Sequence, residues 1–170
     1  ISLGLVGSEM CIRDSYYMSK IFISIASLRD PTLEATMRIA LKNADYPENI
    51  VFGVGAQYYD DEMPDFKFLN KNQLRLLKIN PDTRPGVVRL RYEISKLIQD
   101  EDYFLSIDSH MLFKQHWDTK AIGWIKELQE KAGKKKVCVT NGRIVMDQIQ
   151  SSEQVIVQLC TPKNLSLIHI

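Results

Sequence analysis

Tyr103-Phe104-Leu105-Ser106-Ile107-Asp108-Ser109-His110 is a hydrophobic run that stops abruptly at three polar residues. A nearly unbroken apolar run of this length is typical of a strand buried on both faces of a parallel sheet. Parallel sheets bind ligands beyond the carboxyl ends of their strands. Asp108 and His110 would then point into that crevice as oxygen and nitrogen ligands for a divalent metal. The alternative is that this polar segment only caps a turn or the next helix.

Similar apolar runs occur earlier in the chain. Residues 21–26 and 50–56 resemble two more buried strands. Between them, Asp30 is a good helix N-cap and Pro31 fits the first helical position. Apolar residues then recur at helical spacing: Leu33, Met37, Ala40, Leu41 and Ala44. This pattern predicts a strand, an amphipathic helix and a parallel strand joined by a right-handed crossover.

The alternation continues beyond the second strand. Residues 58–72 are acidic, polar and aromatic and indicate a surface loop, and residues 74–79 form a short strand candidate. A second helix is expected to share one apolar face made of Val87, Leu90, Ile94, Leu97 and Ile98. Another helix begins near Gln115, and residues 137–140 and 155–159 are further strand candidates. Alternating apolar strands and amphipathic helices predict an α/β three-layer sandwich with a mostly parallel sheet.

Composition excludes several classes of protein. The chain has 22 Lys and Arg against 21 Asp and Glu, and no basic stripe indicates nucleic-acid binding. No apolar run is long enough to cross a bilayer. The three cysteines form no C-x-x-C pair, so neither a disulfide framework nor a zinc knuckle is expected. This usage favours the cytoplasm over the secretory pathway, and Cys138 is expected to be a buried small hydrophobe.

The two ends resemble translated sequencing adaptor. The last six residues back-translate to CTGTCTCTTATACACATC, whose reverse complement in a shifted frame encodes Met10-Cys11-Ile12-Arg13-Asp14. Two termini encoded by opposite strands of one DNA element are not a protein feature. We therefore expect residues 1–15 and 165–170 to be artefactual, and residues 16–164 to be a fragment truncated at its C-terminal side.

Polar residues with useful chemistry follow several of the predicted strands. Ser27, Arg29 and Asp30 follow the first strand and Gln57 follows the second. Three arginines lie at or near the start of the second helix: Arg84, Arg89 and Arg91. A helix N-terminus attracts anions and arginine clamps phosphate in a bidentate way. Together with a divalent metal, these residues suit a nucleoside diphosphate. Taken singly, each has a plainer explanation: the arginines as surface residues, and Asp30 as a helix cap.

Several segments in order resemble one enzyme family: residues 23–31, 52–57, 86–91, 103–113 and 117–118. Together they resemble the N-acetylglucosaminyltransferases that modify hydroxyproline on the Skp subunit of SCF ubiquitin ligases. The Asp-Ser-His triplet also occurs in polypeptide N-acetylgalactosaminyltransferases, which points to the GT-A superfamily. The resemblance spans residues 21–122 and fades beyond Val137.

This resemblance implies a GT-A-like, Rossmann-related fold, with residues 16–164 as the N-terminal nucleotide-sugar-binding part of the domain. It implies a UDP-N-acetylglucosamine donor, a Mn²⁺ or Mg²⁺ ion, and a hydroxyl acceptor on a protein or a glycan. Asp108 and His110 would be the metal ligands. The implied donor-binding residues are Ser27, Arg29, Asp30, Gln57, Gly86, Arg91 and Ser109. Arg91 would approach the diphosphate or brace the Asp-Ser-His loop, and Gly86 would allow close approach of the chain.

Some positions depart from the family pattern, namely Leu28, Leu90 and Ser106, so a different UDP-sugar such as UDP-N-acetylgalactosamine stays open. No residue is identified as a catalytic base. A nucleotide-sugar-binding domain without turnover is a second hypothesis. A metal-dependent hydrolase is a third, but residues 16–164 supply only His110 and His116 as histidines.

Overall fold

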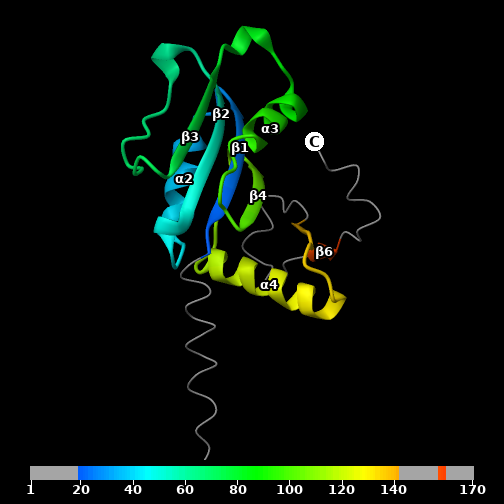
Figure 1. The fold of residues 1–170 in the computed structure, drawn as a ribbon. Coiled ribbons are helices and arrows are strands. Elements are labelled where there is room, and N and C mark those ends of the chain that lie inside the picture. The colour runs from blue at the N-terminus through cyan, green and yellow to red at the C-terminus, as the bar shows by residue number, and fades with distance from the viewer. Residues whose placement is uncertain (1–18, 142–156, 160–170) are drawn as a thin grey trace, which may run out of the picture. The chain divides into compact units, whose positions relative to one another are not determined.

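The computed structural model describes residues 19–141 and 157–159 (Figure 1). Residues 1–15 and 165–170, interpreted as adaptor, lie outside them. The chain divides into two compact units, Ile1–Thr119 and Lys120–Ile170. The helix α4, Trp117–Ala132, begins in the first unit and continues into the second. The second unit also contains β5 (Val139–Asn141) and β6 (Val157–Leu159), which pair antiparallel.

The first unit holds a four-stranded parallel sheet. Its strands are β1 (Ile21–Leu28), β2 (Ile50–Gln57), β3 (Leu74–Ile79) and β4 (Tyr103–Asp108). Its helices are α2 (Leu33–Lys42) and α3 (Val87–Ser95), with short 3-10 helices η1 (Pro47–Asn49), η2 (Asp60–Glu62) and η3 (Pro81–Thr83). The predicted α/β fold with a parallel sheet is confirmed.

The strand order is β3-β2-β1-β4. The connection from β1 to β2 leads toward the β3 side of the sheet. The connection from β3 to β4 leads back across β2 and β1. Since parallel crossovers are right-handed, α2 and α3 lie on opposite faces of the sheet, as Figure 1 shows. The order also places a topological switch point between β1 and β4, where α/β sheets bind ligands.

The α3 side of the sheet has a core of Phe22, Val51, Leu90 and Ile94. Two glycines of β2 allow this packing. A Cβ at Gly53 would lie 2.1 Å from Phe22 Cζ, and a Cβ at Gly55 would lie 2.6 Å from Leu90 Cδ1. These distances leave no room for a side chain at either position. The close packing of α3 therefore requires both glycines of the Phe-Gly-Val-Gly sequence.

On α2, the predicted apolar stripe is confirmed at Leu33, Met37 and Ala40, which are fully buried, whereas Leu41 is half-buried and Ala44 lies beyond the helix end. The predicted helix start is wrong. The helix begins at Leu33 with Thr32 as its N-cap, and one Asp30 carboxylate oxygen accepts hydrogen bonds from the Thr32 N–H and hydroxyl just before it. This Asx-type turn precedes the helix and occupies the residues expected to be its first turn.

Two expectations about exposure also need correction. On α3, Leu90 and Ile94 are buried as predicted, but Val87 is 55% exposed and Ile98 lies beyond the helix end. The strand β4 was predicted to be buried on both faces, yet Phe104 is 52% exposed and stacks on Phe22. Among the described strands, β4 is paired on one side only, with β1, so it lies at the edge of this sheet.

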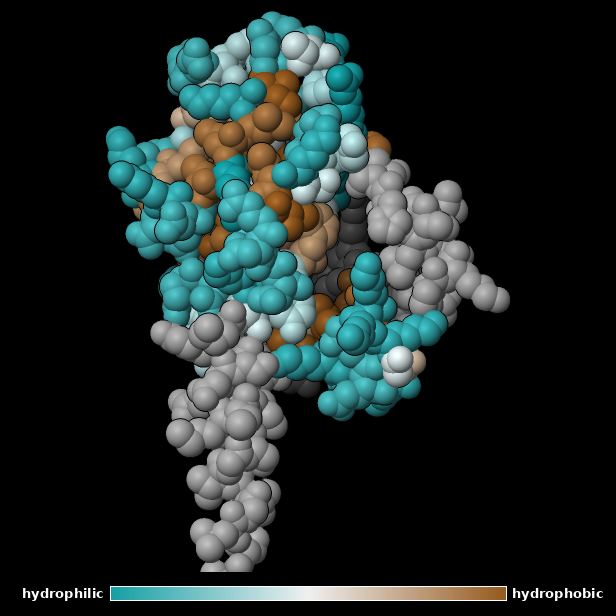
Figure 2. Space-filling view, in the orientation of Figure 1, coloured by the Kyte–Doolittle hydropathy of each residue, from teal (hydrophilic) through white to brown (hydrophobic). Residues whose placement is uncertain are grey.

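A cavity of about 310 Å³ lies between β3 and α3, lined by Leu77, Ile79, Thr83, Pro85, Arg89, Leu90 and Glu93. Figure 2 shows hydrophobic side chains gathered over these two elements. In the second unit, Cys138 is half-buried rather than buried. Within the described residues, no helix is both long and apolar enough to span a bilayer.

Candidate functional site

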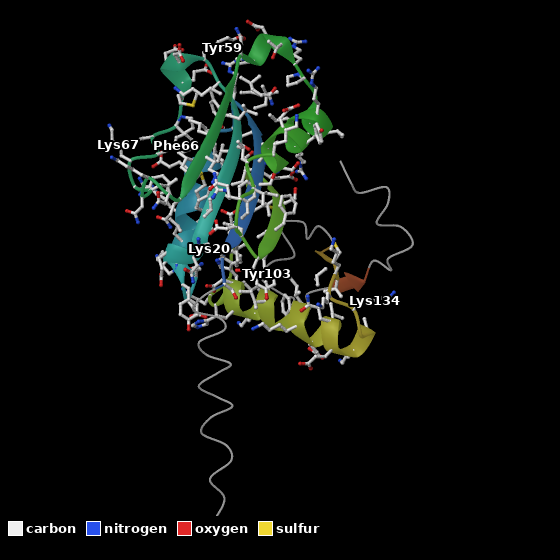
Figure 3. The ribbon with its side chains drawn as sticks, in the orientation of Figure 1. Lys20, Tyr59, Phe66, Lys67, Tyr103 and Lys134 are labelled. Carbon is white, nitrogen blue, oxygen red and sulfur yellow. The ribbon has the colours of Figure 1, made fainter. Side chains whose placement is uncertain are left out.

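The predicted site residues gather at the carboxyl ends of the parallel strands. Figure 3 labels Tyr59 at this end of the sheet, and Lys20 and Tyr103 at the opposite end, where β1 and β4 begin. None of the predicted metal or donor residues lines the cavity between β3 and α3. The strand ends, and not that cavity, are therefore the candidate site.

Asp30 is the centre of this site. One carboxylate oxygen binds the Thr32 turn, and the other accepts hydrogen bonds from Ser109 Oγ at 2.6 Å and from His110 Nδ1 at 3.0 Å. The side chain is 19% exposed. Burial by itself would raise the pKa of Asp30, but the hydrogen bonds from Ser109, Thr32 and His110 outweigh it and hold that pKa well below its ordinary value. Asp30 is therefore an ionised carboxylate that only accepts hydrogen bonds.

The state of Asp30 fixes the orientation of His110. Because the carboxylate only accepts, the shared hydrogen is assigned to Nδ1, and in the neutral ring the lone pair lies on Nε2. The His110 side chain is 66% exposed. Metal-binding histidines usually donate their second ring N–H to a carboxylate or carbonyl in this way. The contact with Asp30 thus leaves Nε2 as the ring nitrogen of His110 that could coordinate a metal.

The loop that follows β4 is held by the start of α2. The Ser109 carbonyl accepts a hydrogen bond from Thr36 Oγ1 at 2.8 Å, and Thr32 Oγ1, which donates to Asp30, lies 3.2 Å from the same oxygen. The Met111 N–H donates in turn to Thr36 Oγ1, and Ser109 is buried. The Asp-Ser-His turn is therefore a fixed structure, and the polar segment does more than cap a turn of its own.

Asp108 is oriented by the opposite helix. Arg91 Nη2 of α3 donates to Asp108 Oδ1 at 2.7 Å, and Nη1 donates to Ser106 Oγ at 2.9 Å. The same Nη2 lies 3.4 Å from the Ile107 carbonyl oxygen. Arg91 therefore braces the Asp-Ser-His loop in this structure, which is one of the two roles implied for it.

Arg29 lies on the rim of the site. Its N–H donates to the Gln57 carbonyl at 3.1 Å, so the ends of β1 and β2 are joined. Its guanidinium forms a two-pronged ion pair with Glu62 and lies 5.1 Å from the centre of the Tyr59 ring. The Tyr59 hydroxyl donates to Asp82 beyond β3. The loops after three strands are thus connected through Arg29.

Other predicted residues stand apart from this network. Gly86 is the N-cap of α3 with a φ of 78°, and a Cβ there would meet nothing within 4 Å. Its backbone conformation suits glycine, and no other group of the described protein lies close to it. Arg84 and Arg89 are exposed. His116 is exposed as predicted and pairs with Asp45.

Tyr58 is the main functional candidate that sequence reasoning missed. It was assigned to a surface loop, but it is buried, and its hydroxyl contacts Ser27 and the backbone of Asp30. The only available signal was its position directly after the buried strand β2. Three more contact residues were also missed: Glu62, Thr32 and Thr36. A carboxylate in an acidic loop and two threonines at a helix start have no distinctive sequence pattern.

The donor set can be tested against a divalent metal. Within residues 19–141 and 157–159, no group of three or more His, Cys, Asp or Glu side chains could hold a metal ion. Asp108 and His110 are the donors at the switch point. Magnesium-type sites commonly use one or two protein ligands and take the rest from substrate phosphates and water. A metal held by Asp108 and His110 would likewise have to take its other ligands from a substrate and water.

The fold and this site define an α/β protein with a polar ligand site at the switch point of a parallel sheet. Residues 64–141 match a family model described as Glycosyltransferase (GlcNAc). The match includes β3, α3, β4 and the Asp-Ser-His turn, and it supports a glycosyltransferase resembling those that transfer N-acetylglucosamine. Comparison with curated proteins and with solved structures gave no match.

Proposed function

We propose that this chain contains the donor-binding part of a metal-dependent glycosyltransferase. The transferase would move N-acetylglucosamine from a UDP donor to a hydroxyl of a protein or glycan acceptor. The observation that carries the proposal is the pairing of His110 with ionised Asp30 beside Asp108, at the switch point between β1 and β4. The family match over residues 64–141 supports the transferase class.

Each residue of the site has a role in this proposal. Asp108 and His110 would hold Mn²⁺ or Mg²⁺, which when bound would neutralise charge on the diphosphate leaving group. Arg91 keeps the Asp108 carboxylate in place, and Asp30 keeps the His110 ring in place. Ser27, Arg29, Gln57 and Ser109 would line the nucleoside side of the donor.

The finer assignment rests on the resemblance in the sequence. It supports UDP-N-acetylglucosamine as the donor and the Skp-hydroxyproline type as the kind of transferase. Leu28, Leu90 and Ser106 depart from that pattern, so UDP-N-acetylgalactosamine must be measured alongside.

Calorimetry on the 170-residue chain tests the proposal. UDP, UDP-N-acetylglucosamine and UDP-N-acetylgalactosamine are titrated with Mn²⁺ and with a chelator. We expect binding that requires Mn²⁺ and that falls about tenfold or more in Asp108→Ala and His110→Ala. Asp60→Ala, which changes an exposed carboxylate of η2, is the matched control. Absence of Mn²⁺-dependent binding of any of the three ligands would refute the proposal.

A nucleotide-sugar-binding domain without turnover is a second candidate, favoured by one observation. Asp30, the carboxylate at the centre of the site, has a strongly lowered pKa and is occupied by hydrogen bonds. A carboxylate of this kind is a weak general base. Donor hydrolysis separates the two candidates: metal-stimulated release of UDP from the sugar nucleotide supports the enzyme, whereas binding without release supports the binding domain.

A further inference from the structure

We infer that Tyr58 is a positioning residue, whose hydroxyl fixes the turn after β1 and thereby aims the Asp30 carboxylate at Ser109 and His110. This inference adds a positioning residue to the proposed donor site. Its expected effect on donor binding rests on the proposed function. The geometric link itself stands on the hydrogen bonds of the structure.

The Tyr58 hydroxyl is fully used by three contacts. It donates to the Asp30 carbonyl at 2.7 Å, accepts from the Asp30 N–H at 3.1 Å, and lies 2.6 Å from Ser27 Oγ. A phenol has one hydrogen to donate. Since that hydrogen goes to the carbonyl, Ser27 must be the donor in the third contact. One hydroxyl therefore holds both backbone polar groups of Asp30.

The turn that Tyr58 holds is not one the chain adopts freely. Arg29 has a φ of 47°, in the left-handed region that L residues with side chains rarely occupy. Its N–H is bonded to the Gln57 carbonyl. The end of β2 thus holds two consecutive residues of the turn, Arg29 through Gln57 and Asp30 through Tyr58. Such strained conformations persist only where surrounding contacts over-determine them.

The order of the strands explains why one side chain can influence the whole site. β1 lies between β2 and β4 in the sheet. Tyr58 follows β2 and fixes Asp30 after β1, and the Asp30 carboxylate then fixes Ser109 and His110 after β4. The path crosses three adjacent strand ends through hydrogen bonds whose donors and acceptors are all identified.

Tyr58 is suited to positioning and not to proton transfer. Burial raises the pKa of its phenol, although the hydrogen bonds with Ser27 and the Asp30 backbone oppose that rise. The hydroxyl therefore keeps its proton at neutral pH. That proton is already donated to the Asp30 carbonyl, so the group has no proton to exchange with a ligand.

Tyr58→Phe in the full chain tests the inference, because it keeps the ring and removes the hydroxyl. Tyr92→Phe is the matched control, since Tyr92 lies on α3, is 48% exposed and belongs to none of the strand-end loops. The first readout is backbone amide hydrogen exchange, which needs no ligand. We expect exchange to accelerate at Asp30 and at residues 109–111, and to stay unchanged in the strand interiors at Ile25 and Val54.

The second readout is calorimetry of UDP with Mn²⁺. Removing the direct partner of a metal ligand typically weakens binding by about ten- to a hundredfold. Tyr58 acts on that partner, Asp30, so we expect a loss of about tenfold in Tyr58→Phe and none in Tyr92→Phe. Ser27→Ala, which removes one partner of the phenol, should accelerate exchange at the same residues to a smaller degree. The Ser27→Ala variant still tests the inference if Tyr58→Phe does not fold.

Unchanged exchange at Asp30 and residues 109–111, or an equal rise throughout the sheet, would overturn the positioning role. A wild-type chain that binds no UDP would instead overturn the proposed function, and the exchange data would still show whether Tyr58 fixes Asp30. The two failures are therefore distinguishable.

Discussion

Arg91 on α3 holds the carboxylate of Asp108 at the end of β4, with 2.7 Å between Nη2 and Oδ1. The same guanidinium binds Ser106, and its Nε is buried with no hydrogen-bond partner in the described part of the chain. The first residue of the Asp-Ser-His turn is thus oriented by the helix on one face of the sheet. His110, the third residue, is oriented by Asp30 at the end of the neighbouring strand.

Arg91→Ala should weaken Mn²⁺-dependent binding of UDP more than binding of uridine. The reason is that Asp108 loses its partner, and uridine has no diphosphate for a metal held by Asp108 to contact. We expect a loss of about tenfold or more for UDP in calorimetry. Arg89→Ala, an exposed arginine of the same helix, is the control. Equal losses for UDP and uridine would show that Arg91 supports the fold as a whole.

Gly55→Ala should destabilise the first unit more than Gly86→Ala. The new Cβ at position 55 would lie 2.6 Å from Leu90 Cδ1, so α3 must shift, and overpacking of this kind costs about 1–3 kcal/mol. At position 86 the space is open, and only the positive φ of 78° is unfavourable, at about 1 kcal/mol. Urea unfolding measures both variants. Equal costs would contradict the close packing of α3 on β2.

Ser24→Ala and Ser27→Ala should change stability in opposite directions. Both serines of β1 are buried. The Ser24 hydroxyl has no hydrogen-bond partner within the described residues, so removing it should be neutral or stabilise the protein by up to about 1 kcal/mol. The Ser27 hydroxyl donates to Tyr58, and its loss should cost about 1–2 kcal/mol. Free energies of unfolding from urea titrations compare the pair, and an equal loss in both would refute the difference.

Asp30 should make the stability of the protein depend on pH in the acid range. Its folded-state pKa is lowered from an ordinary value of 3.8. Its contribution is therefore fully present above about pH 4 and is lost as the pH falls from there through the folded pKa. Asp30→Asn removes this dependence, so the free energy of unfolding of wild type should fall more steeply below pH 4 than that of the variant.

Urea unfolding of both proteins at pH 7, 4 and 3 provides the comparison. The other carboxylates with lowered pKa values, Asp100 and Glu101, are present in both proteins and cancel. Parallel pH profiles for wild type and Asp30→Asn would show that the hydrogen bonds of Asp30 do not contribute to stability.

The elements of the fold were readable from local patterns. Apolar runs identified β1, β2 and β3 closely, and helical spacing identified the buried faces of Met37 on α2 and Leu90 on α3. The exposure of Phe104 was not readable, because a buried central strand and an edge strand can have the same apolar sequence. Their difference depends on how many neighbours the strand has in the sheet.

The sequence alone singled out the candidate residues: an aspartate and a histidine at the end of β4, an aspartate after β1 and an arginine on α3. Tertiary structure alone decided how they are paired. Asp30 and His110 are 80 positions apart, and Tyr58 and Asp30 are 28 apart. Local sequence cannot specify such pairs, because they depend on the order β3-β2-β1-β4. That order places the ends of β2, β1 and β4 side by side, and with right-handed crossovers it sets α2 and α3 on opposite faces of the sheet.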